Sequence, residues 1–317
     1  MSDNAPVRAH DNVGRGILFT VVAILAFGVQ DAASKILTQD HSPFQIAMMR
    51  FWAFAAFSLW LVSRQAPLRA AMKSRRPGLQ VLRALLLLLD IWAFAFAVRS
   101  VPLAELHAIV LIYPLLVTLI AIPILGERVG VFRLTAVSVG FAGAMIIVRP
   151  GGLPIDEGVI AAVLGSVAYA AYIALTRKVS DEDSAATSMV YVGVVGLIGS
   201  SLVGAFFWQP LHGMALVLTA VVMVTTCVGH GLMIAALSIA PASTLQPFNY
   251  LSLPWAMVLG LAVFGTWMDT LSLVGALVVV LAGLAVMARE RSLAARGRLT
   301  SAAAAAPSKA AAGSPPH

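Results

Sequence analysis

Ionisable side chains stand at a few places inside long apolar stretches of this 317-residue chain. Asp90 interrupts the leucine run at 85–89, and His230 stands in a second apolar stretch. Such groups are costly in hydrocarbon, so they usually face a protein interior, where they pair or line a wet path. A carboxyl group and an imidazole in that setting can both exchange protons. The pattern indicates a path for a solute or a proton.

Both residues also have a purely structural interpretation. Asp90 could bond to Arg83 two turns below it, and His230 could be a core histidine whose hydrogen bonds are satisfied. A shift of 139 places Asp90 on Gly229, next to His230, so the two groups have quasi-symmetric positions. The sequence leaves both interpretations open.

A second group of charged residues is expected where three apolar stretches, 17–37, 44–62 and 103–125, approach the outer surface of the membrane. Asp31 lies about six residues from the outer end of the first, and Arg50 about seven from the outer start of the second, so at about 1.5 Å per residue they reach similar depths. We expect them to pair, with Lys35, one turn from Asp31, as a second partner. His107 opens the stretch at 103–125. The group is either a structural ion pair or an outer gate.

Amides, phenols and prolines gather on two further stretches. Tyr113 is followed by Pro114, and Gln246, Asn249 and Tyr250 surround another proline. Proline removes a backbone donor and interrupts a helix. Polar clusters on such helices are the best sequence indication of a transporter's binding site. The aromatic candidates for its walls, with ordinary helix packing as the alternative, are Trp92, Tyr169, Tyr172 and Trp255.

The composition requires a bilayer around these residues. The chain is 60% hydrophobic and 11% charged, with a mean hydropathy of +0.92, which excludes a water-soluble globule. We predict an all-α membrane protein with ten transmembrane helices, because ten apolar stretches are long enough to span. They are 17–37, 44–62, 79–98, 103–125, 134–148, 159–175, 186–208, 214–237, 245–264 and 271–288.

The basic residues predict the orientation. With a cytoplasmic N-terminus, seventeen of the 21 Lys and Arg residues lie inside, and three lie outside: Lys35, Arg99 and Arg149. Both termini are therefore expected in the cytoplasm, as tails at 1–14 and 289–317, and the Ala-rich sequence from Thr300 is expected to be disordered. The net charge of +7 lies in short links between spans, so it does not predict a nucleic-acid partner.

The chain also repeats itself. The shift of 139 places Pro102 on Pro241 and Gly126 on Gly265, at both ends of a helix pair. Each half, 15–149 and 157–288, holds five spans, and an odd number makes the halves inverted repeats. Inverted repeats are the usual construction of secondary transporters.

At this point the chain resembles a known family, the ten-helix EamA group of the drug/metabolite transporter superfamily, from Gly14 to Ala288. Where the second repeat of that family usually reads Phe-Gly-Glu, this chain has Phe264-Gly265-Thr266, so the role of the glutamate does not carry over. The resemblance rests on Phe27-Gly28 with Asp31 and Lys35, Arg50-Phe51, Arg83, Val101-Pro102-Leu103-Ala104-Glu105, Tyr113-Pro114-Leu115, Leu125-Gly126-Glu127-Arg128, Thr176-Arg177-Lys178 and Ala240-Pro241-Ala242-Ser243.

The resemblance implies carrier-type movement of a small organic metabolite across an inner membrane, in a direction that it does not settle. Aromatic rings beside amides, with one fixed acid at the midplane, suit a flat, largely neutral solute, and within the family this resembles vitamin uptake, with riboflavin as the specific expectation. The alternative is transport or efflux of amino acids or a derivative such as S-adenosylmethionine, whose ammonium could meet Asp90.

Other classes fit less well. The chain has no His-Glu-x-x-His, Gly-x-Ser-x-Gly, paired-Cys or phosphate-loop motif, so we expect no enzyme, metal or cofactor. A single chain of inverted repeats also fits a carrier better than an ion channel. The expected partners are the bilayer, the substrate and protons as a coupling ion, in either a monomer or a homodimer.

Overall fold

The computed structural model describes residues 13–65, 67–125, 130–149, 153–180, 182–240 and 242–305. Within these ranges the regular elements are all helices. In chain order they are α1 (Val13–Asp40), α2 (Pro43–Ser63), α3 (Leu68–Ala71), α4 (Pro77–Ser100), α5 (Leu103–Val110), α6 (Tyr113–Leu125), α7 (Val131–Ile147), α8 (Glu157–Val179), α9 (Ala185–Gly204), η1 (Ala205–Phe207), α10 (Met214–Ile239), α11 (Ala242–Leu245), η2 (Gln246–Leu251), α12 (Ser252–Phe264) and α13 (Thr270–Ala305).

Nine segments of the described chain are helical, long and apolar enough to cross a membrane. Two of them join short helices: 103–124 combines α5 with α6, and 246–264 combines η2 with α12. The fifth predicted stretch lies in α7, whose apolar part, Leu134–Ile147, is shorter. The chain is therefore a multi-pass membrane protein, and the tenth span stays a prediction.

Prolines break two of these segments. After α5 ends at Val110, a turn intervenes before α6, where Pro114 occupies the second position. In the second case the 3₁₀ helix η2 carries Pro247 in its first turn and leads into α12. A proline nitrogen cannot donate to the carbonyl four residues earlier, and its ring crowds that carbonyl, so the α-helical ladder is interrupted. Both interruptions were predicted from the proline positions.

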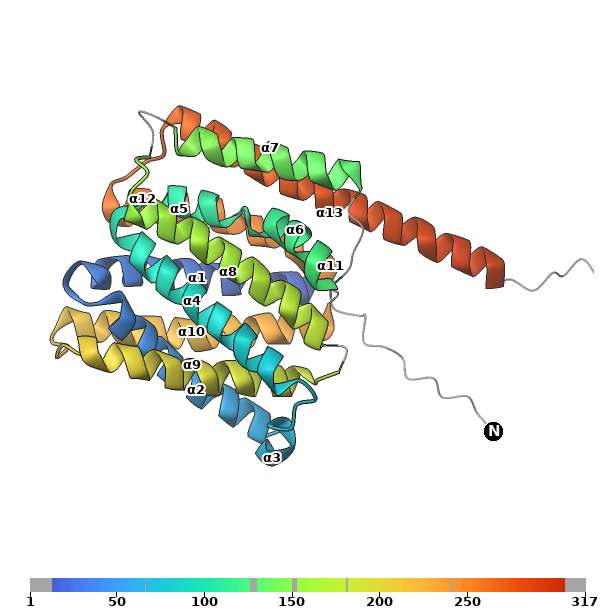
Figure 1. Cartoon of the computed structure of the whole chain (residues 1–317). Helices are drawn as coiled ribbons and strands as arrows, with labels where there is room; N and C mark the ends of the chain where they lie inside the picture. Colours follow the sequence, from blue (N-terminus) through green and yellow to red (C-terminus); the bar gives the residue numbers. More distant parts are fainter. Residues whose placement is uncertain are drawn as a thin grey trace, which may run out of the picture.

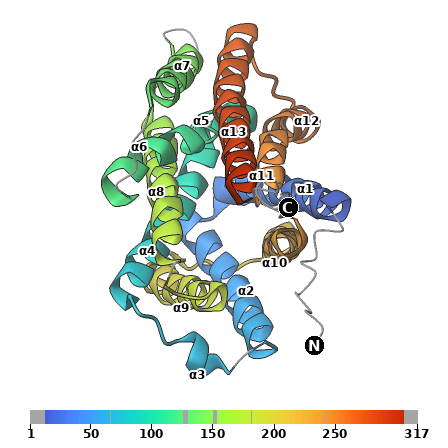
Figure 2. The ribbon, with the colours of Figure 1, turned by 90° about the vertical axis from the view of Figure 1, so that its right-hand side faces the viewer.

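The helices lie side by side as a bundle (Figures 1 and 2). α4 packs on α8, and α8 on α6, while α1 packs on α10 and α12. We call the helices α4, α5, α6 and α8 the first group, and α1, α10, α11, η2 and α12 the second group. The pairs α2–α9 and α7–α13 flank them on opposite sides in Figure 2. We call the end where α1 begins at Val13 the proximal end and the end where α1 finishes at Asp40 the distal end.

The pair α7–α13 packs backbone against backbone at two glycines. A Cβ added at Gly275 would lie 2.5 Å from the carbonyl oxygen of Gly143, and one added at Gly143 would lie 2.8 Å from that of Gly275. Helices without a hydrophobic driving force in lipid associate through such close contact. This pair is scaffold beside the two groups of helices.

Thr266 closes α12 where the resembled family usually has glutamate. Gly265 takes the left-handed conformation (φ 65°), and both the backbone N–H and the hydroxyl of Thr266 donate to the carbonyl of Gly260, at 3.0 and 3.1 Å. This is the pattern of a glycine C-cap followed by a return bond. Thr266 thus supplies a helix stop in place of a charge.

The last helix is longer than the sequence indicated. α13 continues to Ala305, past Thr300, where loss of structure was expected. Alanine has the highest helix propensity, and this stretch contains no proline before residue 307, so the helix continues. The rest of the predicted tail, 306–317, and the N-terminal residues 1–12 lie outside the described residues.

Candidate functional site

Arg50 on α2 lies among ionisable groups from three other helices. It interacts electrostatically with the carboxylates of Asp31 on α1 and Asp90 on α4, and its charge also acts on His230 on α10. Asp90 interacts in turn with the phenol of Tyr169 on α8. All of these except Asp31 are half-buried. The fold therefore brings together candidate residues from five helices, which we call the central cluster.

Asp90 and His230 make different contacts within the central cluster. The carboxylate of Asp90 faces Gly165 of α8, where an added Cβ would lie 3.4 Å from Oδ1. The ring of His230 lies against Phe27 and Phe54, with centroid distances of 5.1 and 4.8 Å. Neither side chain forms a hydrogen bond with another described residue.

Asp31 has a nearer partner than the one predicted. Nε2 of His107 on α5 lies 3.3 Å from Oδ2 of Asp31, although without the alignment of a hydrogen bond. Both residues are buried, with 8% and 9% of their surface exposed. In the described part of the chain, Arg50 and Asp31 form no ion pair within 4 Å. The predicted Asp31–Arg50 pair is replaced by a longer-range attraction, because α5 inserts His107 beside α1.

Lys35 does not serve as a second partner for Asp31. Its Nζ donates to the backbone carbonyls of Val98 and Val101, at 2.6 and 2.8 Å, where α4 ends. The last carbonyls of a helix have no partner within the helix and attract a cation. Lys35 therefore caps α4 from α1 and joins the two groups of helices at the distal end.

Arg83 does not hold Asp90 either. Its guanidinium donates to Oε1 of Gln80 at 2.9 and 3.2 Å, to the hydroxyl of Thr176 at 3.0 Å, and to the carbonyl of Ser188 at 2.7 Å. These acceptors all lie nearer the proximal end than Asp90, so the arginine is satisfied there. The structural interpretation of Asp90 as the partner of Arg83 is wrong.

Asp183 organises the loops beside Arg83 at the proximal end. Its carboxylate accepts hydrogen bonds from the hydroxyl of Ser74, the amide of Gln80 and the backbone of Arg75, at 2.5 to 2.9 Å. Desolvation opposes ionisation, but these donors outweigh it and lower the pKa of Asp183 below its ordinary value. The network ties the loop before α4 to the loop before α9.

Three tyrosines form a row between α6 and α8. Tyr113 meets Tyr169 edge to face with centroids 5.0 Å apart, and Tyr169 stacks on Tyr172 at 5.7 Å. The guanidinium carbon of Arg83 lies 5.3 Å from the centroid of the Tyr172 ring, and the phenol of Tyr113 lies near the side-chain amide of Asn249. All three rings are half-buried. This tyrosine row connects Arg83, on the proximal side, with the central cluster.

The broken segment of the second group contributes two amides. Nδ2 of Asn249 donates to Oε1 of Gln246 at 2.9 Å. Tyr250 does not join them: it is 7% exposed, and its hydroxyl is buried against Gly283 of α13. Residues three apart in a 3₁₀ helix share a face, whereas the next residue is turned away by about 120°. The expectation that Tyr250 lines the same site is therefore wrong.

Trp92 also faces away from Asp90. Side chains two residues apart in an α-helix point about 200° apart. The indole of Trp92 meets Phe44 of α2 edge to face at 5.5 Å, and its Nε1 is buried without a hydrogen-bond partner. The structure places Trp92 in helix packing. Trp255 is likewise structural, because its indole N–H donates to the carbonyl of Leu25 at 3.0 Å.

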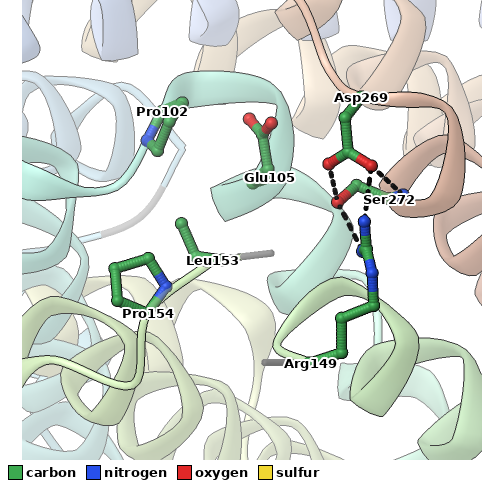
Figure 3. Close-up of a pocket in the computed structure, with 7 residues that line it drawn as sticks. All are labelled: Pro102, Glu105, Arg149, Leu153, Pro154, Asp269 and Ser272. Atoms are coloured by element: carbon green, nitrogen blue, oxygen red, sulfur yellow. Dashed lines mark hydrogen bonds and ion pairs between the residues drawn. The ribbon is translucent and has the colours of Figure 1, made fainter. Parts of the chain in front are cut away.

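A pocket of about 400 Å³ opens at the distal end (Figure 3). Glu105 lines it with Arg149 and Asp269. A guanidinium nitrogen of Arg149 lies 2.7 Å from the carboxylate of Asp269, which Ser272 also bonds at 2.5 Å. These hydrogen bonds lower the pKa of Asp269 below its ordinary value. Arg149 and Asp269 thus satisfy each other within the pocket. The pocket does not include any residue of the central cluster.

Apolar spans, two of them broken beside amides and phenols, define a multi-pass membrane transport protein. A model of the EamA-like transporter family matches residues 14–149 and again residues 156–288. The chain therefore belongs to the EamA-like transporter family, within the drug/metabolite transporter superfamily.

Curated relatives match most of the chain. A riboflavin transporter of Rhizobium johnstonii is 29% identical over 87% of this chain and 91% of the relative, and one of Vibrio cholerae is 27% identical over 79% and 85%. An S-adenosylmethionine uptake transporter of Rickettsia prowazekii is 24% identical over 87% and 93%. A solved crystal structure of a protein, 16% identical, matches with a TM-score of 0.61 over 88% of this chain and 99% of its own, which shows the fold.

Sequence reasoning missed the polar side of the tyrosine row. The sequence indicates Tyr172 only as a candidate wall of the site, and Arg83 only as a candidate partner of Asp90. A signal was present, because Tyr169, Tyr172 and Thr176 are spaced i, i+3 and i+7, which places them on one face of a helix.

Replacing Asp183 by asparagine should lower thermal stability in detergent at neutral pH. A lowered folded-state pKa stabilises the fold above the unfolded value of about 3.8 and stops doing so as the pH falls through the folded value. The difference in Tm between wild type and Asp183→Asn should therefore shrink between neutral pH and about pH 3. Asp40→Asn, at the exposed end of α1, is the control. A difference that stays constant with pH would contradict this assignment.

Proposed function

We propose that this chain is a secondary transporter of the inner membrane that moves a flat, largely neutral vitamin such as riboflavin into the cell. The observation that carries the substrate class is the tyrosine row, which presents half-buried aromatic faces beside the amide of Asn249. Aromatic faces stack on a flat ring system, and an amide hydrogen-bonds to its edge. Two relatives named as riboflavin transporters support the same choice.

We further propose ten spans in two inverted repeats, 15–149 and 157–288, with both termini in the cytoplasm. The family model matches twice with nearly these bounds, which supports the repeats. Helix packing supports the repeats as well. The equivalent helices of the two halves are α1 and α8, α2 and α9, α4 and α10, and α7 and α13. The contact of α1 with α10 therefore has its counterpart in the contact of α8 with α4, and the pairs α2–α9 and α7–α13 are each formed by two equivalent helices. The distal end is then periplasmic, in agreement with the basic residues.

A second substrate class follows from the charges of the central cluster. Two carboxylates, Asp31 and Asp90, act on one guanidinium, that of Arg50. Asp31 also has His107 beside it, whereas Asp90 has no hydrogen-bond partner among the described residues. A partly buried carboxylate is stabilised by a positive charge. Asp90 therefore suits either a coupling proton or the ammonium of a solute such as S-adenosylmethionine.

Reporter fusions test the topology. A reporter that works only in the cytoplasm should be active when it is joined after residue 305. A reporter that works only in the periplasm should be active when it is inserted in the loop at 209–213. The control is a fusion in the loop at 72–76, which should report the cytoplasm. An active periplasmic reporter at the C-terminal position would overturn the inverted repeats, because it requires an odd number of spans.

Right-side-out vesicles test the substrate. Riboflavin uptake should be saturable, accelerated by riboflavin inside, and insensitive to excess S-adenosylmethionine. Tyr169→Ala should raise the KM about tenfold because the central ring of the tyrosine row is lost, whereas Tyr169→Phe keeps the ring and should change it little.

Tyr191→Ala is the matched control, since this tyrosine is bonded to the carbonyl of Met72 on the proximal surface. Riboflavin uptake no greater than that of vesicles without the protein would refute the vitamin assignment. Uptake of S-adenosylmethionine in the same vesicles would favour the second class.

The variant Asp90→Asn shows whether Asp90 carries a coupling proton or only lines the path of the substrate. If Asp90 carries a coupling proton, the variant should retain exchange of internal for external substrate but lose accumulation driven by a pH gradient, because asparagine cannot titrate. The measurement is accumulation at several external pH values, normalised to protein abundance, with Asp40→Asn as the control. Unchanged accumulation and pH dependence would remove Asp90 from this role.

A further inference from the structure

The two groups of helices are closed on each other at the distal end. Lys35 and Gln39 of α1 both bond to carbonyls at the end of α4, and Asp31 meets His107 of α5. Beneath these polar contacts lies an apolar layer, which we call the distal seam. Its buried residues are Ala32, Ala97, Val98, Val101, Leu103, Leu106, Ile109, Val159, Ala162, Ala256 and Leu259.

The equivalent closure is missing at the proximal end. In the second half, α8 is the equivalent of α1 and α10 is the equivalent of α4. The counterpart of the α1–α4 contact would therefore be a contact between α8 and α10. α1 packs on α4, but in the described part of the chain α8 and α10 have no comparable packing. The polar residues near that end, Gln246 and Asn249, are exposed and half-buried. The two groups of helices therefore pack together at the distal end and not at the proximal end, an asymmetry typical of one of the two states that alternating access requires.

α4 and α10 end in the same way. The N–H of Val101 bonds to the carbonyl of Ala97 at 2.9 Å, and 139 residues later the N–H of Ala240 bonds to that of Ala236 at 3.0 Å. The carbonyls of Val98 and Val101 receive Lys35. Their counterparts at 237 and 240 receive no side-chain donor from the described residues.

A lysine is placed to serve that second helix end. The counterpart of Lys35 is Ala174, and Lys178 lies one turn further along the same face of α8. In this structure Nζ of Lys178 donates to the carbonyl of Ile124, at the end of α6, within its own group of helices. It is half-buried and makes this one side-chain hydrogen bond with the described residues, whereas Lys35 makes two.

We propose that Lys35 and Lys178 are alternating gate residues. Lys35 caps α4 and closes the distal end in the state seen here. When the proximal end closes, Lys178 leaves Ile124 and caps α10 at the carbonyls of Leu237 and Ala240, while Lys35 releases α4. In each state a cation meets, at the closed end, carbonyls that have no partner within their helix, so the closed end carries no uncompensated helix end. The proposal rests on the inverted repeats but on no particular substrate.

Accessibility of the distal seam tests the proposal. Ala97→Cys, in a Cys227→Ser background, introduces one thiol of nearly alanine size at a fully buried position of the seam. A membrane-impermeant maleimide added from the periplasm then reports how often the distal end opens. Lys35→Met should raise the labelling rate about tenfold, since two charge-assisted bonds of the closed state are lost. Lys178→Met should lower the rate below that of the parent.

Lys73→Met, on the exposed loop before α4, is the matched control and should leave the rate unchanged. Lys35→Arg keeps a cationic donor and should label more slowly than Lys35→Met, which separates gating from misfolding. An unchanged rate in Lys35→Met, or a rate in Lys178→Met that does not fall, would overturn the proposal. Because no substrate is needed, failure of riboflavin transport leaves this result unaffected.

Discussion

Hydrocarbon offers no hydrogen-bond partner, so every backbone group that leaves the α-helical ladder inside the membrane must find one in the protein or in a wet path. This constraint explains where polar residues occur in an otherwise apolar chain. Prolines break two spanning segments, and the tyrosine row and Asn249 lie beside those breaks. Lys35 meets the free carbonyls at the end of α4. Polar side chains thus gather where the backbone is incomplete.

The elements themselves could be predicted, because their causes are local. Apolar length determines a span, and a proline determines a break, so nine spans and both interruptions follow from the sequence. The contacts of the candidate site depend on which helices meet. Asp31 and Arg50 were paired from depth alone, and depth does not reveal that α5 places His107 closer. A spacing of two turns on one helix allows Arg83 to bond to Asp90, but it does not reveal that Gln80 and Thr176 take the guanidinium instead.

Local geometry explains the remaining differences. The sequence offers Tyr250 as a phenol beside Asn249 and Trp92 as an aromatic wall near Asp90. In a 3₁₀ or α-helix, one or two residues of separation turn a side chain toward a different neighbour. Tyr250 accordingly packs on α13 and Trp92 on α2. Sequence proximity predicts depth in a membrane well, but it predicts facing only when the helix type is known.

The two halves are similar in architecture but not in the position of the lysine that we propose as a gate. Lys35 reaches two carbonyls, whereas Lys178 stands one turn beyond the equivalent position, where the end of α6 is also within reach. A cation with an alternative partner gains less from closing the proximal end than one without. This difference favours the distally closed state when no substrate is bound. A carrier with that preference must use binding energy from its solute, or a proton, to open its distal end, since a ligand shifts such an equilibrium only through its differential affinity for the two states.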